Sequence, residues 1–209
     1  MDILVACEES QAVTKEFRKL GHNAFSCDVL DCSGGHPEWH IKDDVLPLIN
    51  GNCRFNTVTG QKYQIDKWDM IIAFPSCTYL SNVAAVHLFR GSKLNLDRYN
   101  KGLAAKKFFM SFWEADCKKV AIENPVSSKI FNLPNYSQEI QPFMFGHPYT
   151  KKTRLWLKGL PPLFATDLVR ILRPWVSSGN NNGLHHDCLN RSKTFPGVAA
   201  AMADQWSNL

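Results

Sequence analysis

Short apolar runs bounded by polar turns recur along the chain and predict the strands of a buried sheet. The clearest are Ile-Leu-Val-Ala within residues 2–7, Met-Ile-Ile-Ala-Phe within residues 68–74 and Val-Ala-Ile within residues 119–123. Near-continuous apolar runs of this length are typical of strands that are buried on both faces of a parallel sheet. The pattern therefore predicts an α/β protein with a mostly parallel sheet and helices on both of its faces.

The first 28 residues predict one strand–helix–strand unit. After the first strand, apolar residues recur at helical spacing within residues 11–20, and Gly21 follows as a helix-ending residue. Residues 23–28 then predict a second strand that ends on Asp28. Such a unit has a right-handed crossover, and nucleotide-type ligands bind at the ends of its strands.

Polar and turn-rich segments separate the remaining predicted elements. Residues 31–40 and 177–183 have the composition of loops, and residues 55–65 alternate on both sides of Thr-Gly, which predicts a small hairpin inserted beside the core. Residues 82–100 are polar and basic, and we expect this stretch to be mobile until a substrate binds. Further helices are predicted over residues 101–117 and 195–206.

Length and composition predict one soluble domain that spans residues 1–209. Hydrophobic residues make up 44% of the chain and charged residues 21%, and no apolar run approaches the roughly 20 residues that cross a bilayer. The N-terminus lacks the basic start and the long apolar stretch of a secretory signal, so we expect a cytoplasmic protein. The formal net charge of +5 is compatible with a polyanionic partner.

Two of the predicted strands end in residues that can carry chemistry. Cys77 follows the apolar run 68–74, and Glu123 ends the apolar run 119–123. The seven cysteines are odd in number and have no framework spacing, which predicts thiols rather than disulfides. Because the carboxyl ends of parallel strands lie at one edge of a sheet, we expect the thiol and the acid to meet there, as covalent catalysis by cysteine requires.

The order of these motifs resembles the cytosine carbon-5 DNA methyltransferases, and more closely a compact phage and prophage branch of that family. Pro75-Ser-Cys77-Thr78 is similar to the nucleophile loop of the family, Glu123-Asn124-Pro125 to its Glu-Asn motif and Lys152-Thr-Arg154 to its basic motif. Cys7-Glu8-Glu-Ser10 stands at the first cofactor motif, Cys27-Asp28 at the acid that holds the cofactor ribose and Asp43-Asp44 at the acid that meets the adenine. The segment 195–206 resembles the closing C-terminal motif.

The resemblance implies a Rossmann-like methyltransferase fold that transfers a methyl group from S-adenosylmethionine to carbon 5 of cytosine. It implies that Cys77 adds to carbon 6 of the base, that Glu123 protonates ring nitrogen 3 and that Arg154 holds the exocyclic oxygen. This chemistry requires no metal. The implied cofactor-binding residues are Cys7, Glu8, Ser10, Asp28, Asp44 and Pro75, and the implied substrate-binding residues are Thr78, Ser81, Asn124 and Lys152.

DNA is the partner that the resemblance implies, and a base in duplex DNA has to leave the stack to reach Cys77. Segment 160–192 resembles a shortened remnant of a target-recognition region, which leaves little protein to read a sequence in the major groove. So short a region would imply low sequence specificity, a helper protein for target recognition, or a smaller substrate than DNA. The candidate phosphate contacts are Arg90, Lys93, Arg98, Lys151 and Lys152.

Two other functions stay open at this point. The turn at residues 8–11 lacks the glycines of the family, and Ser76 stands where proline is common, which fits a catalytically silent nucleic-acid or nucleotide binding module. His147 and His40 are expected to be hydrogen-bonded structural groups rather than catalytic ones. The second open function is zinc binding, because suitable spacings separate Cys27, Cys32, His36 and His40.

Overall fold

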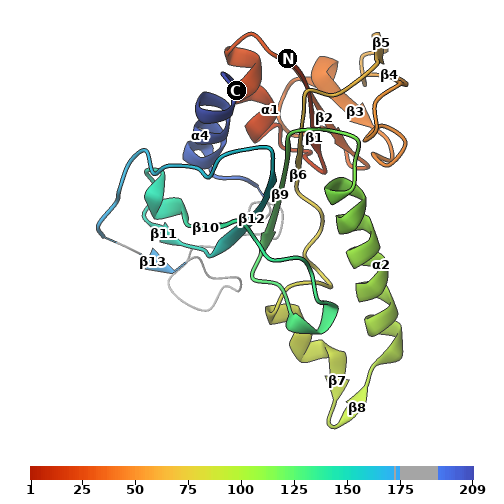
Figure 1. The fold of residues 1–209 in the computed structure, drawn as a ribbon, viewed down its shortest axis with the longest axis vertical. Helices are drawn as coiled ribbons and strands as arrows, with labels where there is room; N and C mark the ends of the chain where they lie inside the picture. Colours follow the sequence, from red (N-terminus) through yellow and green to blue (C-terminus); the bar gives the residue numbers. More distant parts are fainter. Residues whose placement is uncertain (172, 175–192) are drawn as a thin grey trace.

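A seven-stranded, mostly parallel sheet forms the centre of the protein (Figure 1). The computed structural model of the chain describes residues 1–171, 173, 174 and 193–209. The strand order is β10-β12-β9-β6-β1-β2-β3; neighbours from β9 to β3 pair in parallel, whereas β12 is antiparallel to both of its neighbours. The predicted α/β class with a mostly parallel sheet is confirmed. The strands are β1 (Asp2–Ala6), β2 (Asn23–Asp28), β3 (His40–Lys42), β6 (Met70–Ala73), β9 (Val120–Pro125), β10 (Gln138–Ile140) and β12 (Thr153–Lys158).

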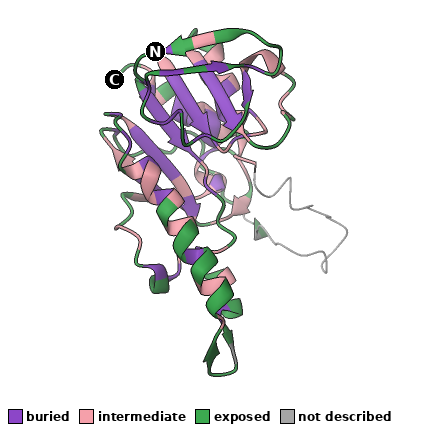
Figure 2. Cartoon of the chain, turned by 90° about the vertical axis from the view of Figure 1, so that its right-hand side faces the viewer, coloured by how far each residue is buried: buried purple, intermediate pink, exposed green. Residues whose placement is uncertain are grey.

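Helices cover both faces of this sheet (Figure 1). Helices α1 (Ala12–Lys19) and α4 (Pro196–Trp206) pack against each other and against the face that carries Ile3, Ile72 and Leu155. Helix α2 (Leu96–Trp113) covers the opposite face, where its residues Phe109 and Phe112 are fully buried. Figure 2 shows the buried strands of the sheet and the exposed far end of α2, which projects from the body of the molecule together with β7 (Phe89–Arg90) and β8 (Lys93–Leu94).

The N-terminal strand–helix–strand unit forms as predicted. Strands β1 and β2 are parallel neighbours, and Gly21 follows α1 with a φ of 80°, the left-handed conformation that favours glycine at a helix end. At the other end of α1, the N-cap residue Gln11 makes no capping hydrogen bond. The carboxylate of Glu8 takes that role, because it accepts the backbone N–H groups of Val13 at 2.6 Å and Thr14 at 3.2 Å.

The predicted hairpin is confirmed, with boundaries that differ slightly. Strands β4 (Cys53–Asn56) and β5 (Lys62–Ile65) are antiparallel and form a separate two-stranded sheet. The hairpin is nevertheless part of the core, because the Phe55 ring packs edge-on against Phe25 at a centroid distance of 5.1 Å. The predicted loop 31–40 also contains the 3₁₀ helix η1 (Pro37–Trp39) and the first residue of β3.

The segment 82–100 has more regular structure than the sequence predicts. It contains the 3₁₀ helix η2 (Val83–Leu88), the β7–β8 hairpin and the first turn of α2. Helix α2 therefore runs over Leu96–Trp113 and not over 101–117; Asn95 fixes its start because its side chain accepts the backbone N–H of Arg98 at 3.2 Å. The predicted start is too late because the first turn is largely polar and carries no run of apolar residues.

Several shorter elements complete the described part of the chain. They are the 3₁₀ helices η3 (Lys129–Phe131) and η4 (Pro142–Met144) and the strands β11 (Tyr149–Thr150) and β13 (Arg173–Pro174). No helix among the described residues combines the length and apolar character that a membrane crossing requires. The predicted loop 177–183, Cys188 and most of the segment 160–192 lie outside the described residues.

We expect Gly102→Ala to lower the free energy of unfolding by about 1–3 kcal/mol, although alanine is the better helix former. Gly102 lies within α2, and a Cβ atom at this position would overlap the ring of Phe131. Urea denaturation measures the change. In a Phe131→Leu background the smaller side chain leaves room, so the same substitution should become neutral or stabilising. Equal destabilisation in both backgrounds would contradict the contact.

Candidate functional site

A cavity of about 750 Å³ opens at the carboxyl edge of the parallel strands. Strands β2 and β3 follow β1 on one side of it, whereas β6 and β9 lie on its other side. The strand order therefore reverses between β1 and β6. Ligands of open α/β sheets bind at such a reversal. The cavity is lined by residues that follow five strands: 7–10 after β1, 28–30 at the end of β2, 43–45 after β3, 74–78 after β6, and Glu123 and Pro125 in β9.

Cys77 lies in an exposed turn at this cavity. Ser76, Cys77 and Thr78 are exposed and all line the cavity. The hydroxyl groups of Ser76 and Thr78 are 2.9 Å apart, and the carbonyl oxygen of Cys77 accepts the N–H groups of Leu80 and Ser81 at 3.2 and 3.0 Å. Ser76 thus braces the turn through a side-chain hydrogen bond.

Glu123 lines the same cavity from the neighbouring strand β9. It is only partly exposed, and burial raises the pKa of its carboxyl group above the ordinary value. The positive charge of Lys151 and the hydroxyl of Thr153 oppose that rise because they favour the ionised form. The structure therefore brings the predicted thiol and the predicted acid together at one cavity.

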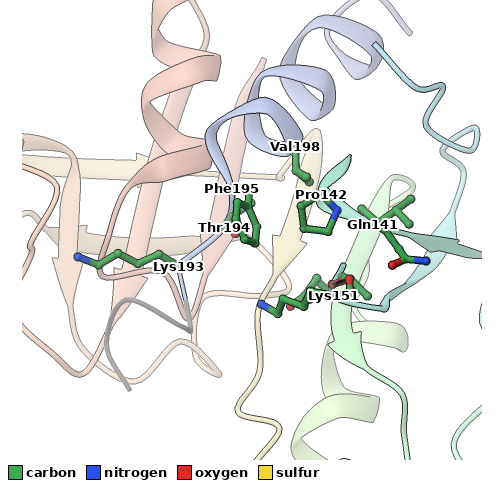
Figure 3. Close-up of a pocket in the computed structure, with 10 residues that line it drawn as sticks. Gln141, Pro142, Lys151, Lys193, Thr194, Phe195 and Val198 are labelled. Carbon is green, nitrogen blue, oxygen red and sulfur yellow. Dashed lines mark hydrogen bonds between the residues drawn. The ribbon is translucent and has the colours of Figure 1, made fainter. Parts of the chain in front are cut away.

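A much smaller hollow, with a volume of about 20 Å³, adjoins Glu123 on the side of α4. Figure 3 shows this region, with the side chains of Lys151 and Lys193 both extending away from the apolar wall that Pro142, Phe195 and Val198 form. Glu123 and both lysines border the hollow and the large cavity alike. The Lys193 side chain extends away from Lys151, so Lys151 supplies the ammonium group that acts on the acid.

Arg154 does not share this cavity. In the antiparallel pairing of β12 with β9, Arg154 lies opposite Asn124 and Leu155 lies opposite Glu123. Since alternate residues of a strand point to opposite faces, Thr153 shares the face of Glu123 whereas Arg154 points to the other. Lys151, which precedes β12, lines the cavity together with Glu123. The cation that this segment supplies to the cavity is therefore Lys151, which directly precedes the predicted basic motif, whereas Lys152 and Arg154 do not line the cavity.

Arg154 and Lys152 belong to a separate cluster around Glu139 of β10. The Nε atom of Arg154 lies 3.6 Å from one carboxylate oxygen of Glu139, and the Nζ atom of Lys152 lies 3.8 Å from the other. The guanidinium of Arg154 also stacks on the ring of Tyr136, with its central carbon 4.2 Å from the ring centre. These contacts hold both side chains beside β10 and outside the residues that line the cavity.

The opposite end of the cavity is acidic. Asp28 accepts the N–H of Leu30 at 3.0 Å, Asp44 accepts the N–H of Leu46 at 3.0 Å, and both line the cavity as predicted. Cys7 directly follows β1 and also lines the cavity. Its φ is 59°, a left-handed conformation that is uncommon for a residue other than glycine. Burial, and then the negative charge of Asp28, raises the pKa of the Cys7 thiol, which keeps it protonated.

Glu8 and Ser10 also line the cavity, yet Glu8 is engaged in the fold. Besides capping α1, its carboxylate accepts the hydroxyl of Thr14 at 2.7 Å, and burial raises its pKa to about 7 against the effect of these hydrogen bonds. Nearby, the buried side chain of Gln11 donates to the carbonyl oxygen of His36 at 2.8 Å and accepts its N–H at 3.0 Å. Gln11 thereby fixes the turn 8–11 to the loop 31–36, a role that its polar character alone did not reveal.

Of the predicted substrate-binding residues, Thr78 lines the cavity and two others support it. The fully buried Asn124 donates its side-chain amide to the carbonyl oxygen of Pro75 at 2.8 Å. Ser81 is buried, pairs with Ser127 in an isolated bridge and accepts the N–H of Ala84 through its hydroxyl at 3.3 Å. Pro75 itself lines the cavity as predicted.

The predicted phosphate contacts have different surroundings. Lys93 is exposed in β8, and Lys151 lines the cavity, whereas Arg98 lies against the chain that follows Cys77. The side chain of Arg90 lies outside the described part of the structure.

The four residues considered for zinc are engaged separately. His40 is fully buried and hydrogen-bonds with Ser26 and Leu30, while the His36 ring stacks on Trp39 at 3.9 Å. Cys32 donates to Gln11, and Cys27 donates to the carbonyl oxygen of Asp43. Within the described residues, no group of three or more His, Cys, Asp or Glu side chains is arranged to hold a metal ion. His147 is a structural group as expected, because its Nε2 atom accepts the N–H of Gly197 at 3.0 Å in the first turn of α4.

Comparison with known proteins adds no family to this geometry. No model of a known protein family matches the chain, and no curated protein shows significant similarity to it. The chemistry of the cavity has to be inferred from the residues that line it. Two of these residues, Lys193 and Thr194, escaped the sequence prediction because they precede α4 and follow no strand.

Glu8 makes the stability of the protein depend on pH. Its pKa is raised from 4.5 to about 7, so between these values the carboxyl group is protonated in the folded protein and ionised in the unfolded chain. The free energy of unfolding should therefore fall by up to about 3 kcal/mol as the pH rises from about 4.5 to above 7. Urea denaturation across this range should show the full fall in wild type and in Glu9→Gln, the matched control, and a clearly smaller fall in Glu8→Gln, in which Glu123 still has a raised pKa. Parallel profiles for wild type and Glu8→Gln would contradict the assignment.

Proposed function

We propose that the protein methylates carbon 5 of cytosine with S-adenosylmethionine as the methyl donor, most effectively in DNA. The observation that carries this proposal is that the thiol of Cys77 and the carboxyl group of Glu123 line one cavity at the strand reversal. Carbon 5 of cytosine is a poor nucleophile, and a thiol and a proton donor acting together on one ring can activate it. The sequence resemblance and the fold class support the same reading.

The acidic end of the cavity fits a nucleoside without phosphate groups. Its volume of about 750 Å³ falls in the range of roughly 300–1,000 Å³ that is usual for small-molecule sites. The helix N-terminus that phosphate-binding sites use is taken by Glu8. Asp28 and Asp44 are suited to ribose hydroxyl and adenine amino groups. S-adenosylmethionine, when bound, supplies the electrophilic methyl group.

The residues of the chain activate the base. The thiolate of Cys77 adds to carbon 6, and Glu123 donates a proton to ring nitrogen 3, so the ring electrons become available at carbon 5. The raised pKa of Glu123 supports this role because it keeps a larger fraction of the carboxyl group protonated than exposure would. After methylation, the proton on carbon 5 passes to water, the Cys77 sulfur leaves as thiolate and the proton on ring nitrogen 3 returns to Glu123, which restores the aromatic ring and the enzyme.

Lys151 takes the role that the resemblance gives to Arg154. It lines the cavity with Glu123, so its ammonium group is suited to bind the exocyclic oxygen of the base and to stabilise the negative charge that develops there during addition. Arg154 is held beside Glu139 on the other face.

The distribution of charge favours a nucleic acid as the methyl acceptor. Residues 1–70 contain seven Lys and Arg against eleven Asp and Glu, whereas residues 71–209 contain 17 against eight. The segment 71–209, which carries Cys77, Glu123 and Lys151, is therefore the basic part of the chain. A basic surface binds the phosphate backbone and does not distinguish sequences, which agrees with low target specificity or a helper protein.

Wild-type protein should transfer labelled methyl groups from S-adenosylmethionine to cytosine in DNA, and Cys77→Ala should abolish the transfer. Glu123→Gln should lower kcat by roughly 10²–10⁴-fold because the proton donor is lost. Digestion of the DNA and detection of 5-methylcytosine measure the product. Cys32→Ala, which removes a thiol that does not line the cavity, is the matched control. Cofactor binding without turnover in wild type would favour the silent binding module.

The cation of the site is tested by Lys151→Met against Lys152→Met, which remove the same charge from opposite faces of the chain. We expect Lys151→Met to lower kcat by roughly 10²-fold. Because Lys151 lowers the pKa of Glu123, its loss should also shift the high-pH limb of the rate profile to higher pH. Lys152→Met should lose about tenfold less activity than Lys151→Met. A larger loss of activity in Lys152→Met than in Lys151→Met would instead assign the charge-stabilising cation to the face that carries Arg154.

A further inference from the structure

Arg98, in the first turn of α2, lies across the chain that follows Cys77. Its Nη2 atom donates to the carbonyl oxygen of Thr78 at 3.1 Å and to that of Ala84 at 3.4 Å. Its guanidinium carbon lies 5.2 Å from the centre of the Tyr79 ring. One guanidinium group thus contacts three points of the segment 78–84.

The main chain of Arg98 is itself fixed. Its N–H donates to the side chain of Asn95, the N-cap residue of α2, at 3.2 Å. Further along, α2 packs against the sheet through Phe109 and Phe112, which are fully buried. The guanidinium group therefore connects the segment 78–84 to a helix that is anchored in the core.

The contact of Arg98 with Thr78 lies between two places where β9 and the chain that follows it support the Cys77 turn. Before the turn, Asn124 holds the carbonyl oxygen of Pro75. After the turn, the carbonyl oxygen of Leu80 accepts the N–H of Ser128 at 2.8 Å. The exposed residue Thr78 lies between these supports and directly follows Cys77, so a donor on its carbonyl oxygen restrains the orientation of the thiol.

We propose that Arg98 is a positioning residue, which fixes the Cys77 turn by binding the carbonyl oxygens of Thr78 and Ala84. The turn matters for catalysis because Cys77 is the nucleophile of the proposed function, on which this inference rests. The role differs from the phosphate contact that the sequence predicts. Lysine keeps the charge that attracts phosphate but lacks the planar guanidinium that reaches two carbonyl groups and stacks on Tyr79.

The test compares Arg98→Lys and Arg98→Gln with Lys101→Gln, the matched control. Lys101 lies one turn further along α2 and pairs with Asp97 of the same helix at 2.9 Å. Hydrogen exchange is followed at the N–H groups of Leu80 and Ser81, which donate to the carbonyl oxygen of Cys77. Both Arg98 variants should exchange there at least about tenfold faster than wild type, whereas Lys101→Gln should exchange at the wild-type rate.

Kinetics with a cytosine-containing DNA duplex give the second readout. A misplaced thiol should lower kcat by roughly 10–100-fold in both Arg98 variants. The KM for DNA should stay within about threefold of wild type in Arg98→Lys, since the charge is retained. Wild-type kcat and wild-type exchange in Arg98→Lys would overturn the proposal, and weaker DNA binding by Arg98→Gln alone would then identify a phosphate contact.

The two proposals fail in different ways. If wild type transfers no methyl group, the proposed function fails, and the exchange rates in Arg98→Lys still decide whether Arg98 fixes the turn. If Arg98→Gln does not fold, Arg98→Lys and its thermal midpoint carry the comparison. Faster exchange confined to Leu80 and Ser81 supports the proposal, whereas faster exchange throughout α2 would show a general loss of structure and overturn it.

Discussion

The parallel pairing of β6 with β9 is the constraint on which the site depends. Ala73, the last residue of β6, is in register with Ile122, so Glu123 of β9 lies just beyond the level at which β6 leads into Pro75. The strands are adjacent because their apolar residues are fully buried in the core, where each side chain contributes about 1.5–3 kcal/mol. The hydrogen bond from Asn124 to Pro75 then closes the two loops on each other. The approach of the thiol to the acid is thus a consequence of core packing.

Much of this arrangement could be predicted from local sequence. The apolar runs identify β1, β6 and β9, and the residues that follow them identify Cys77 and Glu123, because strand ends of a parallel sheet share one edge. The start of α2 was predictable in principle from Asn95, a favourable N-cap residue. A prediction based on apolar periodicity missed it, since the first turn of α2 is polar and gains its order from contacts with the segment 78–84.

The choice of cation shows what local sequence cannot predict. Residues 151–154 contain three basic side chains, and which of them reaches the cavity depends on the register of β12 against β9. A shift of one residue would move Arg154 to the face of Glu123, because the side-chain period of a strand is two. That register is fixed by long-range packing, in which Trp156 joins α2 on one face and Leu155 joins α4 on the other. Neither contact is visible in the motif itself.

The distribution of charge along the cavity gives a physical reason why the two proposed ligands would bind at different ends. Asp28 and Asp44 lie at one end, and Lys151 lies beside Glu123 at the other. In the proposed reaction, a sulfonium nucleoside without phosphate and a polyanionic nucleic acid approach ends of opposite charge, so each is repelled from the place of the other. Glu8 strengthens this separation, because its carboxylate covers the helix N-terminus at which a phosphate group would otherwise bind. A turn without glycine can therefore serve a phosphate-free cofactor, since backbone N–H groups need not approach an anion there.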